Sequence, residues 1–154
     1  MASVVESIDV SVPVSTAYNQ WTQFEEFPRF MEGVKSVKQL DDTHLHWVAE
    51  INGKTEEWNA EISEQHADER IAWRSTDGPD NAGVVTFHRI DDTTSRVTLQ
   101  MDVDPQGVVE NVGTALGFLD RQVKGDLERF KEFVESRGAE TGAWRGEVEA
   151  PAQR

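Results

Sequence analysis

Histidine is the residue type in this chain best suited to metal or acid–base chemistry, and two of the four histidines, His44 and His46, stand two residues apart. They lie where polar and apolar residues alternate, so both fall on one face of an expected strand. Two imidazoles do not complete a metal site, which needs three or four ligands. The pattern puts His66 in a turn and His88 on the polar face of another strand. We therefore expect no metal and no other cofactor.

Other catalytic groups form no recognisable pattern. The chain has no cysteine, which excludes disulfides, thiolate metal ligands and a cysteine nucleophile. It contains no glycine-rich phosphate loop, no Ser-His-Asp order and no nucleophile elbow. The net charge of −14 sets up repulsion from phosphate backbones and anionic lipid surfaces. Nucleic acid is therefore not expected as a partner.

Aromatic side chains are concentrated on one side of the expected strands and in the segment before them. Their members are Trp47, Trp58, Trp73 and Phe87 on apolar strand positions, and Phe24, Phe27 and Phe30 at three-residue spacing. Indole rings combine a large apolar surface with one polar N–H, which suits an apolar ligand that also carries oxygens. For any single ring, an ordinary place in the hydrophobic core is the preferred interpretation, and that alternative stays open.

The first thirty residues predict a strand followed by two short helices. Residues 4–12 alternate between polar and apolar types, and Pro13 ends the pattern. Helical spacing then covers residues 14–31. Because proline disfavours helical geometry in the residue before it, Pro28 predicts the break between the two helices.

Alternation returns in residues 34–103 and predicts six antiparallel strands. Turn residues interrupt it roughly every eight to twelve residues, and Asn52-Gly53 is the strongest of these hairpin signals. The first strand places Val34, Val37 and Leu40 on its apolar face, at irregular spacing. Polar residues occupy most of the opposite face, as an antiparallel sheet with one wet side allows.

One long amphipathic helix is predicted next. Apolar residues recur at steps of three and four across residues 109–134. Gly113 and Gly117 in its first half favour close approach or open volume there. We expect a single domain over residues 1–138, followed by a partly disordered tail over residues 139–154.

Together these elements predict an α+β fold of order β-α-α-β6-α, in which a seven-stranded curved antiparallel sheet covers its apolar face with the long helix. A twisted sheet that curls around a helix leaves a space near one end, and we expect an apolar small molecule there. The residues expected to bind it are Phe24, Phe27, Phe30, Trp47, Trp58, Trp73, Phe87, Leu99, Met101, Val109, Val112 and Leu116.

Four strings of residues carry a resemblance to a known family. They are FPRFMEGV (27–34), RIAWRS (70–75), NAGVVTF (81–87) and TGAWRG (141–146). With the order of elements, they make the chain resemble the polyketide cyclase/dehydrase and lipid-transport family of the START-like (SRPBCC) superfamily, in its bacterial cyclase-like branch. The resemblance covers residues 3 to about 146 and implies a helix-grip fold whose cavity, in relatives, binds lipids, quinones or polyketide chains.

Some members of that family also guide cyclisation and dehydration, which the resemblance makes a second expectation. Aromatase/cyclase relatives place an arginine inside the cavity, where it polarises a carbonyl. Here Arg70 and Arg74 alternate to the outer face, so the inward arginine is missing from that strand. The candidates to replace it are Glu56, Ser75 and Arg89, in phase with the apolar face, and Tyr18 on the first short helix.

The function expected from the sequence is therefore binding of an apolar small molecule of the lipid, quinone or aromatic polyketide type. The alternative is an aromatase/cyclase-type enzyme that acts on a ligand in the same cavity. The first twelve residues lack the basic and apolar regions of a signal peptide, and no stretch approaches the roughly 18 apolar residues of a membrane span. We expect a cytoplasmic protein that does not insert into membranes, and a homodimer is compatible with the sequence.

Overall fold

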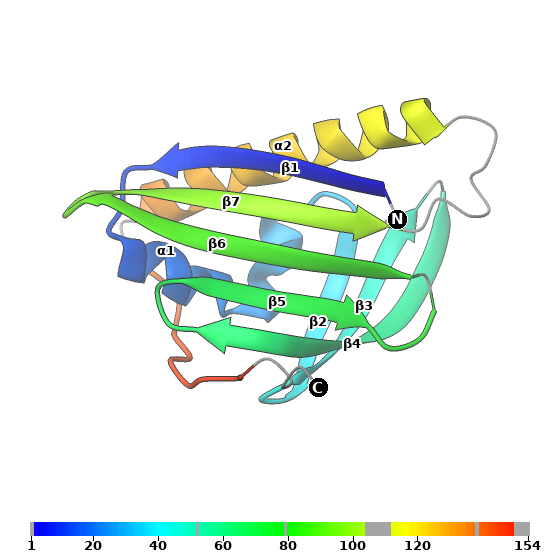
Figure 1. Cartoon of the computed structure of the whole chain (residues 1–154), viewed down its shortest axis with the longest axis horizontal. Coiled ribbons are helices and arrows are strands. Elements are labelled where there is room, and N and C mark those ends of the chain that lie inside the picture. Colours follow the sequence, from blue (N-terminus) through cyan, green and yellow to red (C-terminus); the bar gives the residue numbers. More distant parts are fainter. Residues whose placement is uncertain (1, 52, 79, 104–111, 138, 150–154) are drawn as a thin grey trace, which may run out of the picture.

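The fold is described from a computed structural model for residues 2–51, 53–78, 80–103, 112–137 and 139–149. Its elements confirm the predicted β-α-α-β6-α order (Figure 1). In chain order they are β1 (Ala2–Val10), α1 (Val14–Trp21), the 3-10 helix η1 (Phe24–Arg29), β2 (Val34–Asp41), β3 (His44–Ile51), β4 (Lys54–His66), β5 (Arg70–Ser75), β6 (Asn81–Asp91), β7 (Thr94–Val103) and α2 (Val112–Arg137).

The seven strands form one antiparallel sheet in the order β1-β7-β6-β5-β4-β3-β2. Strands β2 to β7 follow one another across the sheet in chain order, as the short turns between them require. Strand β1 closes the other edge by pairing with β7, with Val4 opposite Met101. Gly53, in the turn between β3 and β4, has a φ of 79°, a conformation that residues with a Cβ adopt at a cost.

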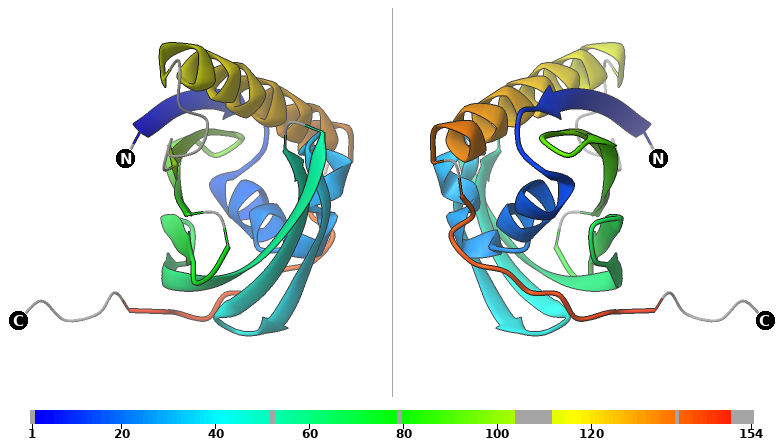
Figure 2. Two further views of the ribbon diagram at one scale, coloured as in Figure 1. Left: turned by 90° about the vertical axis from the view of Figure 1, so that its right-hand side faces the viewer. Right: turned by 90° about the vertical axis from the view of Figure 1, so that its left-hand side faces the viewer.

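Figure 2 shows the sheet curled into a trough, with α2 across its opening. The register shifts between Ile62 and Glu64 in β4 and at two places in β2, and such bulges increase local bending and twist. Helices α1 and η1 lie beneath the C-terminal half of α2 and close one end of the trough (Figures 1 and 2). The apolar face of the sheet is therefore covered by helices along its concave side.

The apolar stripe of α2 faces this concave side. Val123, Leu127, Phe130 and Val134 are all buried, at the steps of four and three that the sequence predicted. Burying a side chain of this size stabilises the fold by about 1.5–3 kcal/mol relative to leaving it in water. The helix is therefore held mainly by its inward face.

Two details differ from the sequence predictions. Leu40 is 58% exposed, not on the apolar face, because the two register shifts in β2 interrupt its alternation around the buried Val37. Pro28 lies inside η1, and the break between the helices comes earlier, where Gln23 leaves helical geometry with ψ 72°. A 3-10 helix tolerates this proline because only a few i→i+3 bonds, such as Phe30 N to Phe27 O, hold it together.

The described part of the tail, residues 139–149, lies against α1 and β4. The Thr141 amide donates to the side chain of Gln20 and the Trp144 amide to that of Thr22, both on or next to α1. The predicted disorder of the tail stays a prediction, and residues 150–154 lie outside the described residues. Among the described residues, no helix has the length and apolar character that crossing a membrane requires.

Candidate functional site

Three tryptophans form a row across the concave face of the sheet. Trp47 in β3 lies directly opposite Trp58 in β4, and Trp73 extends from the same face of β5. The ring of Trp47 stacks on that of Trp58, with centroids 5.9 Å apart and an interplanar angle of 6°. It also stacks on Trp73 at 6.4 Å and 21°. This tryptophan row follows from alternation, which brings every second side chain of neighbouring strands to one face.

The tryptophan row carries buried hydrogen-bond donors without partners. The side chains of Trp47 and Trp58 are buried, yet the Nε1–H group of each has no hydrogen-bond partner among the described residues. A buried donor left unpaired costs about 1–3 kcal/mol. A bound water or a ligand oxygen satisfies such a donor, so this face combines stacked indole rings with two buried N–H groups that lack a partner among the described residues.

A glycine keeps the third ring of the row in place. Gly83 in β6 lies opposite Trp73 in β5, and a Cβ added at Gly83 would come within 2.6 Å of the ring atom Cε2 of Trp73. Because real Cβ atoms do not approach other atoms that closely, only glycine lets the indole of Trp73 come this near to β6. The alternation in the sequence predicts Gly83 as an ordinary position on the apolar face of a strand. It does not indicate the close approach between Gly83 and the ring of Trp73.

The closed end of the trough is filled by aromatic rings. Trp21 on α1 packs edge-on against Phe27 and Phe130, with centroids 5.5 Å and 5.0 Å away. Phe30 packs against Phe130 in turn at 5.2 Å. The phenylalanines that the sequence placed in the ligand site, Phe24, Phe27 and Phe30, are all at most 2% exposed and pack with each other or with Trp21. Trp21 was not among the sequence candidates, although its helical spacing from Tyr18 placed it on the inward face.

The remaining candidate ligand residues lie on β6, β7 and α2. Phe87 and Leu99 are buried, and Met101 is partly buried against the same core. Val109 falls outside the described residues, and Val112 and Leu116 are placed on α2 without described side chains.

The four candidate catalytic residues do not converge. Glu56 lies opposite the inward-facing Ala49, so it does fall on the concave face. The Ser75 hydroxyl accepts a hydrogen bond from the Asn81 amide at 3.0 Å. Arg89 is 59% exposed and pairs with an aspartate of its own hairpin.

Register shows how far apart two of these candidates stand. Trp73 lies opposite Gly83, so Ser75 lies near the first residue of β6, while Arg89 is near the last. Eight residues of strand separate these levels, or about 27 Å. One small molecule does not contact both.

Tyr18 lies at the closed end of the trough, and its hydroxyl already has a partner. It accepts a hydrogen bond from Nε2 of Gln65 at 3.0 Å, and both side chains are fully buried. Burial raises the pKa of the Tyr18 phenol, which keeps it protonated. Its ring packs edge-on against Phe87 at 5.3 Å, so Tyr18 belongs to the aromatic packing of that end.

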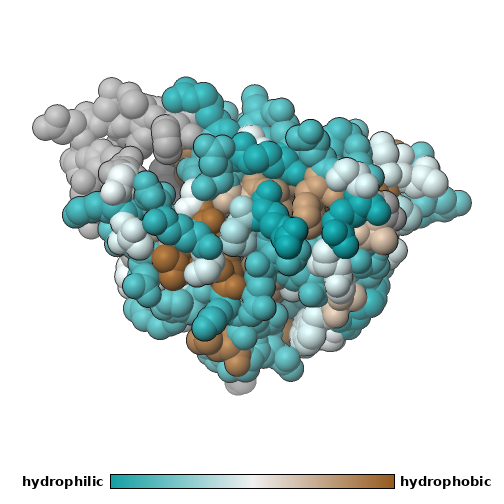
Figure 3. Space-filling view, turned by 180° about the vertical axis from the view of Figure 1, so that it is seen from behind, coloured by the Kyte–Doolittle hydropathy of each residue, from teal (hydrophilic) through white to brown (hydrophobic). Residues whose placement is uncertain are grey.

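A charged pocket of about 480 Å³ lies between the β2 side of the sheet and α2. It is lined by Glu32, Gly33, Lys35, Glu50, Gly53, Arg121, Gln122 and Arg129. Figure 3 shows the molecule from behind, the side of β2 and η1 in Figure 1, where hydrophilic side chains cover most of the surface and hydrophobic ones show between them. No spacing in the sequence signalled this pocket, because its residues come from three separate segments.

Beside this pocket, Asp126 of α2 is only 13% exposed. It accepts hydrogen bonds from Arg129 at 2.5 Å and, more weakly, from the Glu32 amide at 3.4 Å. Burial nevertheless raises the pKa of Asp126 from 3.8 to about 6, outweighing the guanidinium. The carboxyl therefore titrates near neutral pH.

Comparison with known proteins agrees with this architecture. Residues 10–132 match the model of the family described as polyketide cyclase / dehydrase and lipid transport. The chain is also 60% identical over 149 residues to an uncharacterized 17.2 kDa protein of Streptomyces lincolnensis. This alignment covers 96% of this chain and 99% of that protein.

Solved structures show the same fold. A START superfamily protein from Mycobacterium smegmatis superposes with a TM-score of 0.70 at 14% identity, over 88% of this chain and 95% of that one. The Zhui aromatase/cyclase from Streptomyces sp. R1128 gives 0.72 at 14% identity, over 93% and 99%. By its sequence match and its helix-grip architecture, the chain belongs to the polyketide cyclase/dehydrase and lipid-transport family.

Proposed function

We propose that this protein binds an apolar small molecule of the lipid, quinone or aromatic polyketide type between the tryptophan row and the first half of α2. Family and fold suggest hydrophobic ligand binding or polyketide cyclase activity. The described residues include three buried, unpartnered indole Nε1–H groups, those of Trp21, Trp47 and Trp58. The observation that carries the choice of site is that two of them, on Trp47 and Trp58, lie on directly opposed residues of the concave face.

Physical chemistry gives such a site a preference among ligands. A planar ring that stacks on the tryptophan row gains about 0.5–1.5 kcal/mol beyond its burial. A carbonyl or hydroxyl oxygen on that ring accepts hydrogen bonds from the indole N–H groups and removes the free-energy penalty of leaving them unpaired. Oxygen-bearing aromatic molecules should therefore bind more tightly than saturated chains of equal apolar area.

Binding without catalysis is favoured by the arrangement of the polar candidates. The Ser75 hydroxyl accepts a hydrogen bond from a backbone amide. Arg89 is exposed and lies about 27 Å away from Ser75 along the sheet. Aldol chemistry needs donors aimed at one developing oxyanion. Among the described residues, the concave face carries no such convergent set beside the tryptophan row.

Fluorescence quenching tests the proposal. The purified protein is titrated with a naphthoquinone, an anthraquinone-type polyketide and a long-chain fatty acid, and dissociation constants are compared between wild type and Trp58→Phe. Phenylalanine keeps an apolar ring but lacks the N–H, so losing one hydrogen bond of about 1 kcal/mol weakens binding of the oxygen-bearing ligands about fivefold.

Trp144→Phe is the matched control, since Trp144 lies on the tail beside Thr22 and outside the tryptophan row. It should leave the dissociation constants unchanged. Saturable quenching by none of the three ligand classes, or equal weakening by both variants, contradicts the proposed site.

A further inference from the structure

The tail of the protein joins β4 through a short antiparallel bridge. Val148 lies opposite Gln65, and the two residues exchange both backbone hydrogen bonds, at 2.8 and 2.9 Å. Arg145 fixes the preceding part of the tail by donating to Asn19 at 2.7 Å and to Asp68 at 2.8 Å. The last described residues are therefore held in register with the end of β4.

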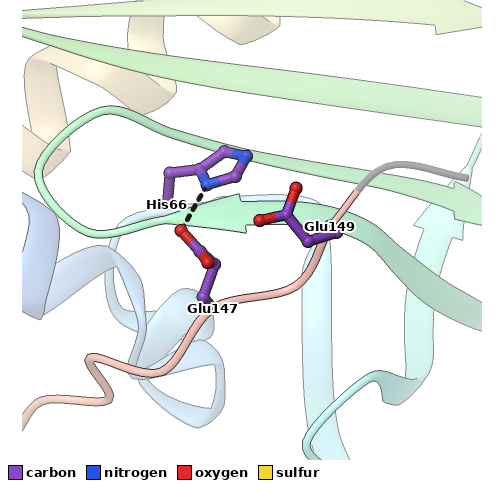
Figure 4. A group of neighbouring side chains, drawn as sticks. All are labelled: His66, Glu147 and Glu149. Carbon is purple, nitrogen blue, oxygen red and sulfur yellow. Dashed lines mark hydrogen bonds and ion pairs between the residues drawn. The ribbon is translucent and has the colours of Figure 1, made fainter. Parts of the chain in front are cut away.

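Strand alternation then decides which side chains meet. Gln65 faces inward and is fully buried, so its neighbours in β4, Glu64 and His66, face outward. Val148 packs on the core, so Glu147 and Glu149 on either side of it face outward as well. His66, expected from the sequence in a turn, is the last residue of β4. Figure 4 shows His66, Glu147 and Glu149 directed toward one another.

These three side chains have the geometry of a ligand set. One nitrogen of His66 and one carboxylate oxygen each of Glu147 and Glu149 all lie within 4.8 Å of one another. His66 Nδ1 is 3.1 Å from the nearer oxygen of Glu147. Two carboxylates this close repel each other, and a cation between them removes that repulsion.

The other side of the imidazole is held as metal-binding histidines usually are. His66 Nε2 lies 3.0 Å from Oε2 of Glu64, and the second oxygen of Glu64 pairs with Arg70 at 3.2 Å. A carboxylate that accepts the Nε2 proton leaves the Nδ1 lone pair free for a metal and fixes the ring orientation. The Glu64–Arg70 pair is neutral, so the charge of the two remaining carboxylates matches that of a divalent cation.

We propose that His66, Glu147 and Glu149 bind a divalent transition-metal ion of the zinc type, with Glu64 as a positioning residue. An imidazole ligand favours zinc and its neighbours over calcium or magnesium, which take oxygen ligands. Three protein ligands leave one tetrahedral position for water. The site lies on the outer face of the sheet, so it is independent of ligand binding at the tryptophan row.

Zinc titration against a chromophoric chelator tests this site on the metal-stripped full chain. Wild type should bind one equivalent of Zn²⁺ more tightly than Ca²⁺. His66→Ala, and separately the double variant Glu147→Gln/Glu149→Gln, should weaken zinc binding at least about tenfold. Glu64→Gln should weaken it about 10–100-fold and leave the absorption spectrum of bound Co²⁺ in its coordination-sensitive region unchanged, since this residue is not a ligand.

His46→Ala is the matched control. His46 also lies on the outer face of the sheet and contacts a carboxylate, with Nε2 3.0 Å from Glu57. Among the described residues, however, it belongs to no group of three possible metal ligands. This variant should bind zinc as wild type does. Zinc binding that survives His66→Ala unchanged, that is lost instead in His46→Ala, or that is no tighter than calcium binding overturns the proposal.

Discussion

The buried carboxyl of Asp126 gives the protein a pH-dependent stability that a single substitution should remove. Its pKa is raised from 3.8 to about 6 in the folded protein because burial disfavours the charged form more than Arg129 favours it. Between these two pKa values the folded state holds a proton that the unfolded state releases. Stability from this group is therefore complete below the unfolded pKa and is lost as the pH rises through about 6.

The size of the effect follows from the difference between the two pKa values. The shift from 3.8 to about 6 corresponds to about 2.2 pH units, or roughly 3 kcal/mol in full. Between about pH 7.5 and pH 4.5 the folded state takes up most of this proton, which is worth about 2 kcal/mol. The side chain is only 13% exposed, so solvent screening leaves most of this value in place.

Urea unfolding of wild type and Asp126→Asn at several pH values measures this effect. Asparagine keeps the shape and an oxygen that accepts from Arg129, but it does not titrate. Because both proteins share all other ionisable groups, the difference in their free energies of unfolding isolates position 126. Wild type should gain about 2 kcal/mol over the variant from pH 7.5 to 4.5. A difference that stays constant, or that shifts toward the variant as the pH falls, refutes the reasoning.

Three further substitutions test the packing by urea unfolding. Gly83→Ala forces its Cβ against the ring of Trp73, so we expect a loss of about 1–3 kcal/mol and a shifted tryptophan emission; an unchanged spectrum and stability would contradict the close approach. Leu127→Ala truncates a side chain that is 1% exposed and should lower the free energy of unfolding by about 2–5 kcal/mol. A loss below ~1 kcal/mol would contradict the packing of α2 on the core. Tyr18→Phe leaves the Gln65 amide without its acceptor and should lose about 1–3 kcal/mol, an argument that fails if the variant matches wild type.

Most of the fold was predictable because its elements have long, regular patterns. Alternation between turn signals defines six strands, and the apolar stripe of α2 repeats over many turns, so an error at one position does not change the assignment. The details that failed are local. The register shifts that expose Leu40 and the 3-10 geometry around Pro28 depend on the strands and helices packed against them, which one segment of sequence does not encode.

The tryptophan row was predictable for a similar reason, since antiparallel neighbours with matching alternation must share a face. Contacts between distant segments were not. His66 meets Glu147 only because the tail pairs with β4, and no spacing along the chain measures that placement. The charged pocket near Arg129 likewise combines the start of β2 and the residues just before it, the end of β3 with the turn that follows, and α2.

The indole N–H signals of the protein test the proposed ligand site most directly. Each of the five tryptophans contributes one such signal to a ¹H–¹⁵N correlation spectrum, and single Trp→Phe variants assign them. On adding a quinone or aromatic polyketide, the signals of Trp47 and Trp58 should move as their free donors gain an acceptor, while that of Trp144 stays in place. Saturable binding that leaves the Trp47 and Trp58 signals unmoved would contradict a ligand site on the tryptophan row.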